Sequence, residues 1–75
     1  MDYKKLREEM TEQALSIEFV MRSHAQIGLA ELSEACNLDP VKTGFILEQM
    51  AVFRMVREAG KGCFSLTTEY RKAWR

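Results

Sequence analysis

The chain has 75 residues, 47% of them hydrophobic, and its 11 basic residues balance its 11 acidic ones. This length and composition predict one small folded domain over residues 1–75 and argue against disorder, while a net charge of zero provides no overall attraction to nucleic acid. The charged N-terminus and the absence of a long apolar run predict neither a signal peptide nor a membrane span.

The first predicted element is a long helix over residues 2–23. This stretch lacks proline and glycine and is rich in strong helix formers. Leu15 and Phe19 lie four residues apart on one flank of the helix, so they either close over the core or form a seam with a second copy of the chain. Apolar residues that recur every three or four positions predict the buried stripe: Tyr3, Leu6, Met10, Ala14, Ile17 and Met21.

Two shorter helices are predicted next, over residues 29–36 and 40–53. Asp39 and Pro40 form a helix start, because an aspartate side chain accepts at the N-cap and proline suits the first helical position. Two helices joined by a three-residue turn predict a helix-turn-helix. The apolar spacing places four side chains of the second helix in the core: Ile46, Leu47, Met50 and Phe53.

A β-hairpin follows, with strands predicted over residues 55–59 and 63–67. Gly60 and Gly62 provide a turn, and the second strand alternates apolar and polar residues. A helical turn over residues 68–75 then places Tyr70 and Trp74 on one face. We expect these rings to pack on the first helix, in the same chain or in a partner's, and the second option predicts a homodimer.

Residues 29–67, LAELSEACNLDPVKTGFILEQMAVFRMVREAGKGCFSLT, resemble the winged helix-turn-helix superfamily, without pointing to one family within it. The resemblance implies a mainly α fold with a small β-hairpin (α+β): three helices, a two-stranded wing and a short C-terminal helix. It further implies a cytoplasmic transcription regulator that binds double-stranded DNA with its third helix in the major groove and its wing on the phosphate backbone.

The expected DNA contacts divide into base and phosphate contacts. Near the base edges are Lys42, Gln49 and Thr43, and on the backbone are Arg54, Arg57 and Lys61. Many winged-helix proteins have glycine where this chain has Arg54, and a positive φ there would cost on the order of 1 kcal/mol.

The outward face of the third helix also suggests a protein-interaction module. It offers one lysine and one glutamine, and Glu48 repels phosphate. Val41 and Phe45 would be exposed apolar residues, which are typical of protein interfaces. In this alternative, Val41 and Phe45, together with Leu15 and Phe19, contact a larger protein or a second copy of the chain.

No catalytic or metal-binding pattern is present in the sequence. His24 is the only histidine, and Cys36 and Cys63 lack the CxxC spacing of a metal site or redox motif. Neither a phosphate-binding glycine loop nor a nucleophile in a recognisable triad occurs. We therefore expect a binding protein without enzyme activity or cofactor, with both cysteines reduced as in the cytoplasm.

Overall fold

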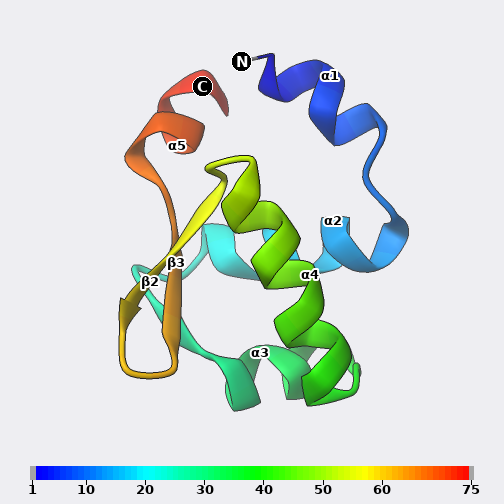
Figure 1. Ribbon diagram of the computed structural model, residues 1–75, viewed down its shortest axis with the longest axis vertical. Coiled ribbons are helices and arrows are strands. Elements are labelled where there is room, and N and C mark those ends of the chain that lie inside the picture. The colour runs from blue at the N-terminus through cyan, green and yellow to red at the C-terminus, as the bar shows by residue number, and fades with distance from the viewer. Residues whose placement is uncertain (1, 75) are drawn as a thin grey trace.

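The computed structural model describes residues 2–74, except the side chain of Trp74. Its architecture is a winged helix-turn-helix, in which α3 and α4 form the helix-turn-helix and the β2–β3 hairpin forms the wing (Figure 1). The elements in chain order are α1 (Tyr3–Glu8), α2 (Glu12–Arg22), β1 (Ile27–Gly28), α3 (Leu29–Cys36), α4 (Pro40–Val52), β2 (Val56–Gly60), β3 (Cys63–Leu66) and α5 (Thr68–Trp74).

The single helix predicted over residues 2–23 is wrong, because the chain breaks it into α1 and α2. Thr11 starts α2, where its side-chain oxygen accepts a hydrogen bond from the amide of Ala14 at 3.2 Å. An unbroken helix of about 20 residues would span roughly 30 Å, whereas the longest dimension of the domain is 29 Å. The break lets α1 turn back and pack against α5 at one end of the molecule (Figure 1).

Local side-chain and backbone preferences explain where α3 ends and α4 begins. α3 ends at Asn37, which is left-handed with φ 54°, and α4 begins at Pro40 with the Asp39 carboxylate accepting from the amide of Val41 at 2.7 Å. Ile46, Leu47 and Met50 are buried as predicted. Phe53 is not, since it caps α4 at the edge of the core and is 42% exposed.

The wing is anchored by backbone contacts at its base. β1 adds a third, two-residue strand, so that the antiparallel sheet has the order β1-β3-β2. Arg54 has φ 61°, which L-residues adopt at a cost. Its carbonyl accepts a hydrogen bond from the Thr67 hydroxyl at 2.6 Å, and the Tyr3 hydroxyl lies 3.2 Å from the same oxygen. These contacts hold the strained residue in place.

A buried carboxylate joins α2 to α5. Glu18 is 1% exposed and accepts hydrogen bonds from the Tyr70 hydroxyl at 2.5 Å and from Arg22 Nε at 2.8 Å, while Arg7 Nε lies 3.8 Å away. The Tyr70 ring stacks edge-to-face on Tyr3 with the centroids 5.1 Å apart. Of the two packing options for Tyr70, the structure therefore has the one within the same chain.

Both tyrosines of the chain lie in this cluster, which makes them reporters of its integrity. Burial raises the pKa of Tyr3 and Tyr70 above the ordinary value of 10.0, and hydrogen bonds to Glu69 and Glu18 raise it further. The folded state holds these protons more tightly than the unfolded state. Their contribution to the free energy of unfolding is therefore complete below pH 10 and is lost as the pH rises towards the folded-state pKa values.

In a spectrophotometric titration we expect the native chain to show clearly less tyrosinate absorbance at about pH 10 than a denatured chain, whose tyrosines are half ionised there. Ionisation should then rise steeply together with alkaline unfolding, as followed by circular dichroism. Half ionisation of the native chain near pH 10 would contradict the buried placement of the two hydroxyls.

Candidate nucleic-acid interface

The outer face of α4 is exposed and mostly apolar. Val41, Phe45 and Val52 are 82%, 57% and 76% exposed, although side chains of this kind are usually buried. Together with the exposed Glu48 they follow one another at intervals of four, three and four residues, which keeps them on one face of the helix. Lys42 is exposed beside them. This strip therefore leaves three large apolar side chains of the helix-turn-helix exposed to solvent.

Gly44 lies in the middle of α4, although no contact within the described residues requires a glycine there. Glycine inside a helix costs roughly 1 kcal/mol relative to alanine. A Cβ atom at this position would meet nothing within 4 Å, so packing within the chain does not require glycine here. The residue lies beside Phe45, where the absence of a side chain lets an external surface approach the helix backbone closely.

The three residues expected at base edges do not share one environment. Lys42 is exposed on α4, and Gln49 is exposed on a flank of the same helix. Thr43 is fully buried, and its hydroxyl donates to the Asp39 carbonyl at 3.0 Å. Its side chain therefore serves the start of α4 and does not reach the surface.

The wing cations separate into two groups. Arg54 and Lys61 are exposed at the base of the wing and at its turn. Arg57 is also exposed, but it lines a hollow with residues of the turn after α2 and of α5. Within the described residues none of the three forms an ion pair or a side-chain hydrogen bond. All three are thus available to an external anion.

The residues expected at a protein interface lie on separate surfaces. Phe19 is 67% exposed on α2, with the Arg22 guanidinium 5.7 Å from its ring centroid, and Leu15 is half-buried next to it. Both line a shallow groove between α2 and α3, away from the outer strip of α4. Tyr70 is buried and presents no surface, while the side chain of Trp74 lies outside the described residues.

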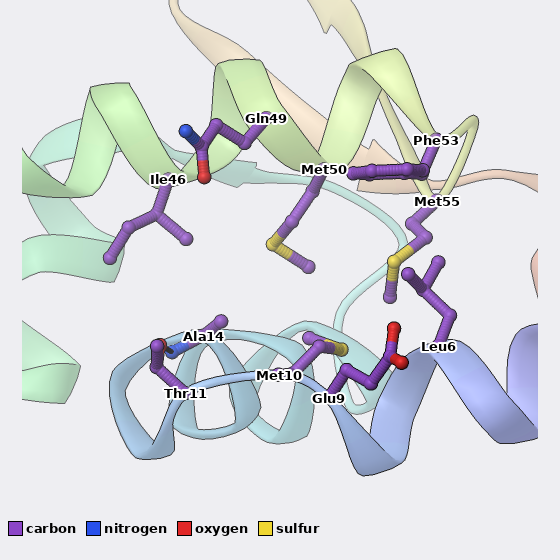
Figure 2. A pocket seen from close by; sticks show the side chains of 10 residues that line it. All are labelled: Leu6, Glu9, Met10, Thr11, Ala14, Ile46, Gln49, Met50, Phe53 and Met55. Carbon is purple, nitrogen blue, oxygen red and sulfur yellow. Dashed lines mark hydrogen bonds between the residues drawn. The ribbon is translucent and has the colours of Figure 1, made fainter.

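A cavity of about 250 Å³ lies behind α4, between that helix and the junction of α1 and α2. Figure 2 shows Ile46 and Met50 projecting from α4 into this space, with Met10 and Leu6 on its opposite side. Most of its lining is apolar. The cavity leaves the inner side of α4 less tightly packed than a filled core would.

Glu18 is the important residue that the sequence analysis did not single out. Its spacing of four residues from Arg22 is a visible helix ion-pair pattern. That pattern is usual on exposed helices, and only the packing of α5 onto α2 turns it into a buried site.

The described residues contain no helix that is long and apolar enough to cross a membrane. Nor do residues 2–74 gather three metal-ligating side chains at one place.

No protein-family model matches the chain, and no curated protein matches its sequence. Solved structures do match its fold. RV1404 from Mycobacterium tuberculosis superposes with a TM-score of 0.81 at 18% identity, covering 95% of this chain and 52% of that one. The reduced form of MarR from E. coli gives 0.78 at 20% identity, covering 87% and 48%.

A MarR family transcriptional regulator from Silicibacter pomeroyi gives a TM-score of 0.75 at 10% identity, covering 95% of this chain and 52% of that one. The chain thus spans about half the length of the proteins that it resembles. At these identities the comparisons establish the winged helix-turn-helix fold.

Proposed function

We propose that the chain is a small DNA-binding transcriptional regulator that inserts α4 into the major groove and lays its wing on the phosphate backbone. The observation that carries the proposal is the exposed outer face of α4 in a winged helix, a fold shared with a protein described as a transcriptional regulator. A helix of this length fits the major groove, where the N-terminal residues of a recognition helix contact the bases.

In this arrangement α4 reads DNA mostly through apolar contacts. Lys42 reaches a guanine or a phosphate, and Gln49 is suited to adenine. Val41 and Phe45 contact the methyl groups of thymine, the base feature that apolar side chains recognise. Gly44 lets the helix backbone sit close to the DNA, while Glu48 opposes phosphates nearby.

The attraction to DNA then comes mainly from outside α4. Arg54 and Lys61 contact phosphates from the wing, with Arg57 as a third cation. We further propose a homodimer, which would double these contacts on a two-fold symmetric site. Phe19 and Leu15 form the candidate seam, since Phe19, the one aromatic residue of α2, is 67% exposed.

Binding to a mixed-sequence duplex at low salt, followed by fluorescence anisotropy, tests this function. We expect binding that weakens as salt is added, with a slope in log–log form of about 0.9 per phosphate contact. Sedimentation equilibrium of the free protein reads its mass, and Phe19→Ser should turn a dimer into a monomer of 8.7 kDa. Absence of binding at low salt and high protein concentration would overturn the proposal.

The exposed apolar strip of α4 favours a second candidate, a protein-interaction module. Aromatic and aliphatic side chains dominate binding energy at protein interfaces, and like the core of such an interface this strip is poor in charge. In that case α4 docks into a groove of a larger protein and the chain does not bind DNA. The two candidates differ in how they respond to a positive charge at Phe45.

A further inference from the structure

A hollow of about 480 Å³ opens between the turn after α2, the β2–β3 hairpin and the start of α5. Three arginines and the only histidine of the chain line it: Arg22, Arg57, Arg71 and His24. None of the described residues that line it is acidic. In a chain with equal numbers of acidic and basic residues, this gathering of cations indicates a place for an anion.

Two side chains in the hollow have polar groups with no partner. Arg57 on β2 and Ser65 on β3 are directly opposite in the strand ladder, so they share one face of the hairpin. Ser65 is only 7% exposed, yet its hydroxyl makes no hydrogen bond to any described residue, and neither does the Arg57 guanidinium. The Ser65 hydroxyl is not among the fully buried atoms of the described residues that lack a partner, so it faces the hollow and is free to donate to a ligand there.

The remaining cations are held in position by the fold. Arg71 donates from Nη2 to the His24 carbonyl at 3.0 Å, which ties α5 to the turn after α2. A guanidinium has five N–H donors, and this bond uses one of them. Arg22 is paired with Glu18, so it contributes less charge to the hollow than Arg57 and Arg71 do.

We propose that this hollow binds a phosphate group, with the Arg57 guanidinium, the Ser65 hydroxyl and the remaining N–H groups of Arg71 as its donors. Two oxygens of a phosphate can accept hydrogen bonds from one guanidinium at the same time. The Ser65 hydroxyl adds a neutral hydrogen-bond donor from β3. The phosphate comes either from the DNA backbone or from a free phosphate compound. The site does not depend on α4 entering the major groove.

Calorimetric titration of the full chain with inorganic phosphate at low ionic strength tests the free-phosphate source, with chloride as the ionic-strength control. We expect one site per chain. Arg57→Gln should weaken it by about tenfold or more and Ser65→Ala by roughly two- to tenfold, which are the effects of losing a charged and a neutral hydrogen bond. Lys4→Gln removes the same charge from an exposed position on α1 and should leave the affinity within about twofold.

The same variants in a duplex titration test the DNA source. If inorganic phosphate does not bind but Arg57→Gln and Ser65→Ala both weaken the duplex complex, the phosphate is that of DNA. The proposal is overturned if Ser65→Ala leaves both titrations unchanged, or if Arg57→Gln weakens whichever binding is observed no more than Lys4→Gln does. Phosphate binding without any duplex binding would overturn the proposed DNA-binding function alone.

Discussion

Replacing the buried Glu18 with alanine should lower the free energy of unfolding by about 3 kcal/mol. This is the largest loss that we expect from replacing a carboxylate of the chain. The substitution removes the acceptor of the buried Tyr70 hydroxyl and the ion-pair partner of Arg22. A domain of this size has only about 4–11 kcal/mol in total. Thermal denaturation should show a decrease in Tm of roughly 12–24 °C.

Two further variants distinguish the loss of the Glu18 contacts with Tyr70 and Arg22 from the general effect of removing a carboxylate. Glu18→Gln keeps an acceptor for the Tyr70 hydroxyl but loses the charge, so its destabilisation should fall between that of alanine and the wild type. Glu34→Ala removes an exposed carboxylate from α3 and should change the free energy of unfolding by less than about 0.5 kcal/mol. Equal effects of Glu18→Ala and Glu34→Ala would show that the buried carboxylate does not hold α5 to α2.

Local chemistry explains which parts of the fold were predictable. The start of α4 at Asp39 and Pro40 depends on a side-chain cap and a fixed proline φ, both of which act within a few residues. The turn of the wing likewise lies at the glycine-containing segment: Gly60 ends β2, and Gly62, with φ 75°, takes the left-handed position of the turn. These features need no knowledge of the rest of the chain, and the structure has them at the expected residues.

The features that were missed depend on contacts between distant segments. The break at Thr11 has only a weak local signal, a single capping residue in a strongly helical stretch, and it is favoured because α1 can then pack on α5. Thr43 was assigned to the surface although helical spacing places it beside the buried Leu47. The hollow around Ser65 requires the register of β2 on β3, which the sequence does not specify.

The strongest test of what α4 contacts is a pair of opposite charges at Phe45. The residue is 57% exposed, so neither Phe45→Glu nor Phe45→Lys should unfold the domain. If α4 lies in the major groove, the glutamate faces phosphates and should weaken duplex binding by about 100-fold, since like charges in an interface cost several kcal/mol. The lysine adds a phosphate contact there and should leave affinity for a mixed duplex unchanged or improve it.

A protein-binding face responds differently, because a desolvated charge of either sign opposes docking into an apolar groove. In that candidate the unmodified chain already fails to bind the duplex, so neither variant changes the duplex titration. Where the unmodified chain does bind, weaker duplex binding in both variants would contradict a groove-facing α4, whereas weaker binding in the glutamate variant alone supports it. Lys4→Gln on α1 changes the net charge by the same unit as Phe45→Glu and controls for the overall field. Glu48→Gln removes the native anion of α4 and should strengthen duplex binding, which makes it an independent check of the same orientation.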